Sequence, residues 1–141
     1  MPDDSIAFVD SNILLYAASG RPADTGKARR ARLLITQEKI CLSFQVLQEF
    51  YANAIHPHKL GLSRAEAIAW CNAWMCHPIA SLGPATFVRT LELIDHYQIS
   101  NWDAAILAAA QELGCSKVYS EDLGHGQNYD GLRVENPFRG F

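Results

Sequence analysis

The chain has 141 residues and a net charge of −3 at pH 7, with 49% hydrophobic and 19% charged residues. Its length is typical of one domain, and its composition excludes an intrinsically disordered protein. No apolar run is long enough to cross a bilayer. The acidic start, Met1-Pro-Asp-Asp4, lacks the basic residues and the longer apolar segment of a secretory signal, so we expect a cytoplasmic protein.

Short apolar runs alternate with helical patterns along the whole chain. The first run, residues 6–9, ends at Asp10 and is typical of a buried strand. Further strands are expected at residues 40–43, 79–82, 117–120 and 132–135. Helices are expected between them, at residues 12–18, 25–37, 44–55, 63–77, 84–97 and 102–113. Residues 124–131, rich in Gly and Asn, are expected to form a loop.

Particular residues mark the ends of these helices. Ser63 and Glu66 have the spacing of a capping box, Pro84 suits the first turn of a helix, and Gly114 suits a helix C-terminus. Strands that alternate with helices predict an α/β domain with a mostly parallel sheet. No repeat, linker or low-complexity tract divides the chain, so a single domain is expected over residues 1–141.

The four cysteines form no CxxC pair, so neither a zinc site nor a disulfide framework is indicated. Reduced and mostly buried thiols are expected instead. These residues are Cys41, Cys71, Cys76 and Cys115.

Four acidic residues fall where buried strands end or where helices begin. Asp10 ends the first strand, and Asp122 follows the fourth strand by two residues. Asp103 lies in the first turn of its helix, and Glu49 lies within the helix after the second strand. Catalytic groups in open α/β sheets gather at the carboxyl ends of the strands, so we expect these four carboxylates to converge at one edge of the sheet.

Each acid also has a simpler explanation. Asp10 is a candidate cap for the next helix, and Asp103 is favoured near the positive end of a helix dipole. Asp122, followed by Leu-Gly-His-Gly, fits an ordinary turn. Glu49 lies among apolar neighbours, and only a water-exposed helix edge would explain it without a function. The joint placement of the four favours a site over these separate explanations.

The chemistry explains why acids would be collected at one place. Neighbouring carboxylates repel one another unless a cation neutralises them, and oxygen ligands suit Mg²⁺ or Mn²⁺. Such an ion activates a water molecule against a phosphodiester bond and stabilises the leaving oxygen. Asn12 and Ser120 are candidates to support the carboxylates through hydrogen bonds.

Other chemistries lack their motifs in this sequence. There is no GxxxxGK[ST] or GxGxxG loop for nucleotides, and the five histidines show no HExxH spacing. His125 lies near the expected site, where a loop residue without a role is the simpler interpretation. The basic segment 27–32 (Lys-Ala-Arg-Arg-Ala-Arg) permits a nucleic-acid partner, but a solvated helix face is the simpler interpretation.

Four motifs occur in a fixed order along nearly the whole chain. They are Ile6-Ala-Phe-Val-Asp10-Ser-Asn12-Ile-Leu-Leu-Tyr16, Gln48-Glu49-Phe50, Asn101-Trp-Asp103-Ala-Ala-Ile106 and Tyr119-Ser-Glu-Asp122-Leu. This pattern resembles the PIN-domain ribonucleases, and among them the VapC-type toxins of bacterial and archaeal toxin–antitoxin pairs. The resemblance implies a three-layer domain with helices on both sides of the sheet.

The resemblance also implies a function. It makes Asp10, Glu49, Asp103 and Asp122 the metal-binding acids, with Asn12 and Ser120 as supporting polar groups. It further implies Mg²⁺ or Mn²⁺, endonucleolytic cleavage of RNA, a homodimer and a small antitoxin partner. Glu121 would be an added acid at the rim of the site. Two alternatives stay open: a non-catalytic RNA- or protein-binding module with this fold, and acids that bind a structural cation.

The helix at residues 63–77 is unusually rich in large apolar side chains. It holds Trp70, Trp74 and Met75. A core role is the simpler interpretation of this surface. The alternative is a dimer or antitoxin groove that includes the helix after Asp24.

Overall fold

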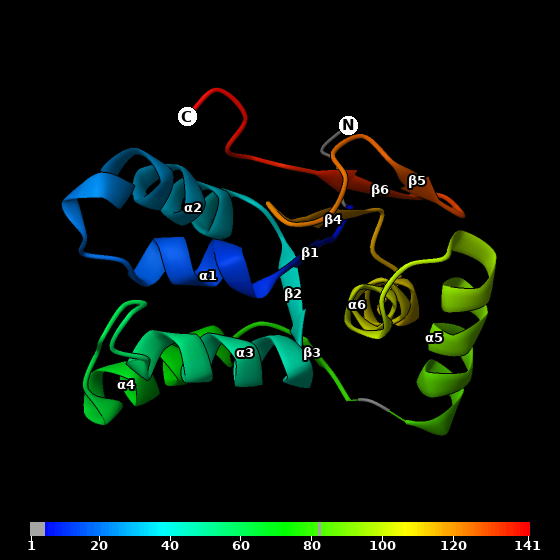
Figure 1. Ribbon diagram of the computed structural model, residues 1–141, viewed down its shortest axis with the longest axis horizontal. Helices are drawn as coiled ribbons and strands as arrows, with labels where there is room; N and C mark the ends of the chain where they lie inside the picture. The colour runs from blue at the N-terminus through cyan, green and yellow to red at the C-terminus, as the bar shows by residue number, and fades with distance from the viewer. Residues whose placement is uncertain (1–4, 82) are drawn as a thin grey trace.

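The computed structural model describes residues 5–81 and 83–141 (Figure 1). The strands are β1 (Ala7–Val9), β2 (Ile40–Ser43), β3 (Ile79–Ala80), β4 (Lys117–Tyr119), β5 (Asn128–Tyr129) and β6 (Leu132–Glu135). The helices are α1 (Ser11–Ala18), α2 (Thr25–Gln37), α3 (Phe44–Ile55), α4 (Arg64–Trp74), α5 (Pro84–Tyr97) and α6 (Asn101–Glu112), with a 3₁₀ turn η1 (Pro22–Asp24). The acidic segment Met1–Asp4 and the end of the expected third strand, Leu82, lie outside the described residues.

The strands form one sheet in the order β3-β2-β1-β4-β6-β5. All neighbouring pairs are parallel except β5 and β6. In the centre of the sheet, Ala7 of β1 lies opposite Ile40 of β2 and Lys117 of β4. The predicted α/β fold with a mostly parallel sheet is therefore confirmed.

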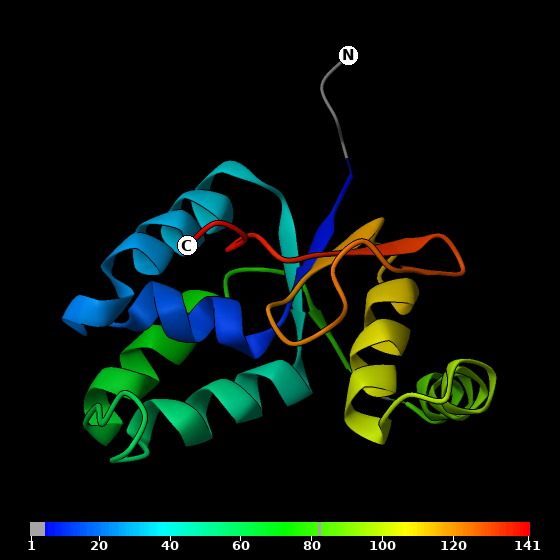
Figure 2. The same cartoon turned by 45° about the horizontal axis from the view of Figure 1, so that its top comes forward.

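Helices cover both sides of this sheet (Figure 2). Helices α1 to α4 lie on one side, and α6 packs against β2, β3, β4 and β6 on the other. Helix α5 packs on the outer side of α6. The central strands are thus buried on both faces, which explains their continuous apolar runs. Among the described residues, no helix is long and apolar enough to span a membrane.

The antiparallel hairpin of β5 and β6 corrects the sequence prediction, which had a loop over residues 124–131. Tyr129 pairs with Leu132 across a two-residue turn, Asp130-Gly131. Both turn residues have positive φ angles, 54° and 95°. Asp-Gly is a preferred pair for such a turn, because both positions need left-handed backbone. The Asp-Gly pair is visible in the sequence, but β5 is only two residues long and shows no alternation of apolar and polar residues.

The predicted helix ends are largely confirmed. Ser63 and Glu66 form both hydrogen bonds of a capping box, and Pro84 is the first residue of α5. Gly114 lies directly after the C-cap residue of α6 with a φ of 74°, and its backbone N–H donates to the carbonyl of Gln111. Helix α4 ends at Trp74, earlier than the expected residue 77, because the chain turns before Pro78.

Trp74 belongs to the hydrophobic core, as the simpler interpretation of its helix predicted. Its side chain is buried, stacks on Trp70 with ring centroids 5.2 Å apart, and meets Phe50 edge-on at 5.9 Å. Met75 is exposed. The largest fully buried side chains come from the strands and from the helices on both sides: Phe8, Phe50, Ile13, Leu14, Leu34, Leu42, Leu93, Leu107 and Leu132.

Two of the four cysteines are buried as expected, and all four are free thiols. Cys41 on β2 and Cys115 before β4 share a contact, with their sulfurs 2.8 Å apart. This contact and burial raise the pKa of the Cys41 thiol, which keeps it protonated. Cys71 is half-buried, whereas Cys76 is exposed.

Candidate active site

Asp10 lies at the end of β1, where the chain enters α1. It is the N-cap residue of that helix, and its carboxylate accepts a hydrogen bond from the backbone N–H of Ser11 at 2.7 Å. The hydroxyl of Ser120, at the end of β4, donates to its other oxygen at 2.7 Å. The capping role expected for Asp10 is therefore present, but the bond to Ser120 ties it to a second strand as well.

The charge of Asp10 is unfavourable where it lies. The residue is only 7% exposed. Burial raises the pKa of Asp10 from 3.8 to about 6, and the negative charges of Glu49 and Asp122 act in the same direction. Hydrogen bonds from Ser120 and Ser11 oppose this rise in the pKa. No basic side chain of the described chain bonds to Asp10, so its charge has no protein counterion.

Glu49 reaches the same place from α3. This helix begins at Ser43, whose side chain accepts the backbone N–H of Val46. One Glu49 oxygen accepts from the hydroxyl of Ser11 and the other from the amide of Gln45, both at 3.0 Å. Neither partner is basic, so these contacts do not make Glu49 one half of an ion pair.

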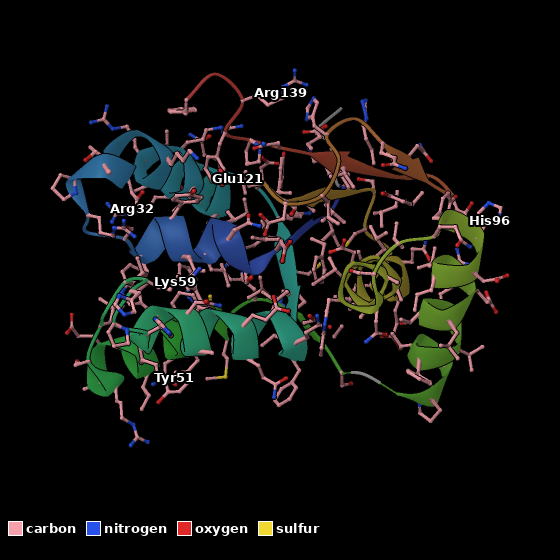
Figure 3. The ribbon with its side chains drawn as sticks, viewed as in Figure 1. Arg32, Tyr51, Lys59, His96, Glu121 and Arg139 are labelled. Carbon is pink, nitrogen blue, oxygen red and sulfur yellow. The ribbon has the colours of Figure 1, made fainter. Side chains whose placement is uncertain are left out.

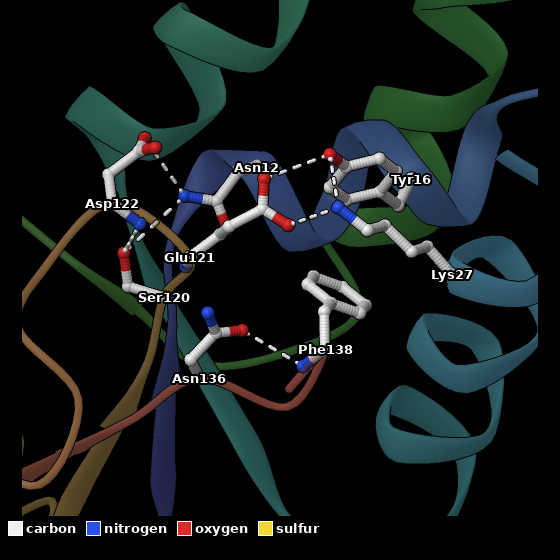
Figure 4. A network of polar contacts seen from close by, with 8 residues as sticks. All are labelled: Asn12, Tyr16, Lys27, Ser120, Glu121, Asp122, Asn136 and Phe138. Atoms are coloured by element: carbon white, nitrogen blue, oxygen red, sulfur yellow. Dashed lines mark hydrogen bonds and ion pairs between the residues drawn. The ribbon is translucent and has the colours of Figure 1, made fainter. Parts of the chain in front are cut away.

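Asp122 is held beside Asp10 by two polar side chains (Figure 4). The Ser120 hydroxyl accepts the backbone N–H of Asp122 at 3.1 Å while it donates to Asp10. The Asn12 amide donates to Asp122 at 3.1 Å, and its oxygen accepts the backbone N–H of Glu121 at 3.2 Å. Asn12 and Ser120 thus link the loop after β4 to the start of α1.

Asp103 lies apart from this network. It occupies the first turn of α6, and its backbone N–H donates to the hydroxyl of Ser100 at 3.1 Å. Its side chain is half-buried, and its negative charge adds to burial in raising the pKa of Tyr129 on β5. Shared hydrogen bonds join the network of Asp10, Glu49 and Asp122, whereas Asp103 has no such bond to it among the described residues.

Glu121 turns away from the other acids. Its carboxylate forms an ion pair with Lys27 of α2 at 2.7 Å and accepts from the hydroxyl of Tyr16 at 2.9 Å (Figure 4). The Tyr16 ring in turn packs edge-on against Phe138, with centroids 4.8 Å apart. Glu121 therefore has its own counterion and fastens the site loop to α1 and α2.

The donor set of the site is made of oxygen atoms, which suits a hard divalent cation such as Mg²⁺ or Mn²⁺. Across residues 5–81 and 83–141, no three acidic, imidazole or thiol groups are close enough together to hold one ion. Ser11 and Asn12 lie between the carboxylates and form hydrogen bonds to them. Mg²⁺ needs only one or two carboxylates and keeps several water molecules. The buried, uncompensated Asp10 and its acidic neighbours therefore fit such an ion.

Two residues of this network were missed by the sequence analysis: Ser11 and Gln45. Gln45 lies four residues before Glu49 on the same helix face, a spacing at which side chains meet. That spacing was available in the sequence. Ser11 directly follows Asp10, but nothing in the sequence indicated that its hydroxyl would meet a carboxylate from α3.

Three of the four basic side chains in segment 27–32 form hydrogen bonds or an ion pair within the fold. Lys27 pairs with Glu121, Arg30 donates to the carbonyl of Pro137, and Arg32 donates to the carbonyl of Ala17. His125, the histidine expected near the site, accepts the backbone N–H of Asn136 at 3.0 Å and thereby shapes its own loop.

A family model described as PIN domain matches residues 7–129 of the chain. A search of curated proteins finds no match. A toxin–antitoxin complex from Klebsiella pneumoniae has a similar fold, with a TM-score of 0.71 and 22% identity over 94% of this chain and 98% of that one.

Two further solved structures share the fold. Mycobacterium tuberculosis VapC20, described as a Sarcin-Ricin loop cleaving toxin, has a TM-score of 0.63 and 20% identity over 82% of this chain and 89% of that one. VapBC2 from Rickettsia felis, bound to a DNA fragment from its promoter, has a TM-score of 0.64 and 18% identity over 93% of this chain and 98% of that one.

Proposed function

Because the chain belongs to the PIN domain family, we propose that it is a metal-dependent endoribonuclease that hydrolyses RNA phosphodiester bonds. The observation that carries this proposal is the carboxylate of Asp10. It is buried, has a raised pKa, lies beside the charges of Glu49 and Asp122, and has no basic partner among the described residues. A protein keeps such an arrangement at a cost in stability, which a bound cation offsets.

In this proposal Asp10, Glu49, Asp103 and Asp122 hold Mg²⁺ or Mn²⁺. A bound ion would supply an activated water molecule and charge stabilisation for the leaving oxygen. Asp103 is included because of its motif and its place in the first turn of α6.

The remaining polar groups position the acids. Ser120 holds Asp10, Asn12 holds Asp122, and Ser11 holds Glu49. These side chains come from α1 and from the loop directly after β4, so the acids are oriented before any substrate arrives. Pre-organisation of this kind is worth a large part of an enzyme's rate acceleration.

We further propose that the chain is the cytoplasmic toxin of a toxin–antitoxin pair. The fold is shared with a toxin–antitoxin complex and with VapC20, a toxin described as cleaving the Sarcin-Ricin loop. The partner would then be a small antitoxin protein that blocks the acid site. This part of the proposal is supported by likeness of fold and by the four motifs.

A cleavage assay tests the nuclease proposal. The purified chain is incubated with structured RNA in the presence of Mg²⁺ or Mn²⁺, and with a chelator. We expect cleavage only with metal, and Asp10→Asn should lower it by about 100-fold or more, since even groups behind the ligands contribute 10- to 100-fold. Asp95→Asn, the same change at an exposed acid of α5, is the matched control.

A second candidate function is a binding module without catalysis. It is favoured by one observation: among the described residues, Asp103 shares no hydrogen bond with the network of Asp10, Glu49 and Asp122. RNA that binds equally well with and without chelator, and stays intact with Mg²⁺ and Mn²⁺, would establish this function and exclude the nuclease.

A homodimer belongs to the proposal as well. Helix α5 exposes the apolar side chains of Phe87, Val88 and Leu91, and Trp102 at the start of α6 is 65% exposed. Large exposed apolar surfaces are typical of protein–protein contacts. We propose that a second copy of this chain covers them.

A further inference from the structure

A cleft of about 310 Å³ runs alongside α1, next to the acid site. One wall is formed by the side chains of Asn12, Leu15 and Tyr16, which lie on one face of α1. The opposite wall is formed by Lys59 and Leu60, in the loop after α3. Figure 3 shows Lys59 in this loop, beside α1. Arg21, beyond the end of α1, closes the far end of the cleft.

The near end of the cleft is continuous with the acid site. Asn12 lines the cleft, and the same side chain donates to Asp122 at 3.1 Å. Anything bound along α1 therefore lies directly beside the carboxylates.

The far end of the cleft is basic. Arg21 has a side chain that is 55% exposed and stands 3.9 Å from the carboxylate of Asp24, a loose ion pair. Asp24 already accepts the hydroxyl of Ser19 at 2.6 Å. Lys59 forms no ion pair with any described residue. With Lys59 on one wall and Arg21 beyond α1, two cations and one carboxylate line the cleft outside the acid site and give it a net positive charge, although the whole chain is negative.

The cleft also has an apolar lining, and its walls are held in place. Leu15 and Leu60 supply the aliphatic part of this lining. The Tyr16 hydroxyl is bonded to Glu121 and Lys27, which keeps this ring from turning into the cleft. Arg32 donates to the carbonyl of Ala17 at 2.8 Å and thereby fixes the end of α1 that leads to Arg21.

We propose that this cleft binds a nucleotide of the RNA strand adjacent to the phosphodiester that is cleaved, an inference that rests on the proposed nuclease function. Arg21 and Lys59 bind a phosphate, because Lys and Arg contacts to phosphates supply most of the affinity for nucleic acids. Leu15 and Leu60 pack against the base, since single-stranded RNA is bound through unstacked bases against side chains. The eight residues of α1 span about 12 Å. The phosphate at Arg21 and Lys59 and the phosphate that is cleaved at the acid site therefore belong to one short stretch of the same strand.

The order of charges favours an RNA strand over a protein segment as the occupant. A strand carries a negative charge at every nucleotide. It can place one phosphate at the basic end and the scissile phosphate among acids that a cation neutralises. A peptide with acidic side chains matches the basic end alone.

The test measures RNA affinity and cleavage for Arg21→Ala and Lys59→Ala, with a labelled single-stranded oligoribonucleotide at several salt concentrations. Each change should weaken binding by about three- to tenfold, and should lower the slope of affinity against salt by about one. The kcat at saturating RNA should stay close to that of the unmodified chain, because a contact of this kind acts equally on ground and transition states. Arg133→Ala, which removes an exposed cation from β6, is the matched control and should change neither the RNA affinity nor its salt dependence.

A chemically altered RNA identifies the contact. A neutral methylphosphonate in place of the phosphate next to the cleavage site should weaken binding to the unmodified chain at least as much as Arg21→Ala does, because Arg21 and Lys59 contact the same phosphate. Combined with Arg21→Ala, the methylphosphonate should cost no more than it costs alone, since the altered RNA already lacks the interaction with Arg21. Unchanged affinity and salt slope in both variants, with cleavage intact, would overturn the subsite and leave the nuclease standing. Loss of affinity for a protein partner alone would also overturn it, whereas absence of any RNA cleavage would overturn the proposed function first.

Discussion

Burial of Asp10 disfavours its ionised carboxylate, so the ionisation of Asp10 should lower the stability of the folded chain. Its pKa in the folded state, about 6, lies above the ordinary value of 3.8, so the folded state holds the proton more tightly than the unfolded state. The contribution of Asp10 to stability therefore falls as the pH rises from about 4 to about 6. Above that range the penalty is complete, and this pKa difference corresponds to about 3 kcal/mol.

Asp10→Asn should remove this penalty. In the presence of a chelator, we expect the variant to be more stable than the unmodified chain by about 1 to 3 kcal/mol at pH 8, and equally stable at pH 4. Urea unfolding at both pH values measures the difference. A variant that is less stable at pH 8 would show that the carboxylate of Asp10 is needed for folding.

A substitution at Glu49 distinguishes whether this residue is a metal ligand or a structural acid. Glu49→Gln keeps the shape of the side chain and removes its charge, while Ser11 and Gln45 remain available as partners. We expect metal affinity to fall about tenfold or more, cleavage to be nearly lost, and metal-free stability to stay the same or rise because repulsion with Asp10 is relieved.

Metal titration and thermal melts measure both effects of the Glu49 change. Glu112→Gln, at the exposed end of α6, is the matched control and should leave both unchanged. A destabilised Glu49→Gln with unaltered metal affinity would make Glu49 a structural residue.

The residues of the site could be predicted in part. Asp10, Asn12, Ser120 and Asp122 carry their signal in short motifs at strand ends, and the structure brings them together. The contact of Ser11 with Glu49 depends on how α3 packs against α1, and no local pattern encodes that packing. The cleft beside α1 depends on a loop after α3 whose path is likewise set by tertiary contacts.

At the scale of elements, the turn after α6 connects the helix that carries Asp103 to the strand that leads to Ser120. Gly114 has a φ of 74° there, a conformation that side chains with a Cβ atom disfavour. A Cβ at this position would meet no atom within 4 Å, so the cost of a substitution comes from the backbone alone.

Gly114→Ala should therefore destabilise the chain by about 1 to 2 kcal/mol. Gly20→Ala is the control, since a Cβ at Gly20 also meets nothing within 4 Å and its φ is not in the left-handed region. Thermal unfolding of both variants measures the difference. Equal stability of the two would show that the turn after α6 relaxes without cost.

Most elements could be predicted because their signals are local. The buried strands read as apolar runs, and the capping box at Ser63 marked α4. The two-residue strand β5 is defined only by its neighbour in the sheet, so the sequence pattern did not place it, whereas β3 begins at Ile79 as predicted. This is why the Asp130-Gly131 hairpin was expected as a loop.

At the scale of the whole molecule, the apolar surface of α5 should hold two copies together. Leu91→Glu places a charge on that surface and should convert a dimer into a monomer without loss of the fold. Ile68→Glu, at an equally exposed apolar residue of α4, is the matched control. Light scattering coupled to gel filtration measures the mass. A dimer that survives Leu91→Glu but not Ile68→Glu would place the interface on α4 instead.

The sheet is short at both of its edges, where β3 and β5 have two residues each. A long, unpaired edge strand offers a row of backbone donors and acceptors to which strands of other molecules can add without limit. Two residues offer too few such groups to start that growth. Concentrated solutions of this chain should accordingly stay free of amyloid fibrils, and any assembly should stop at particles of defined size.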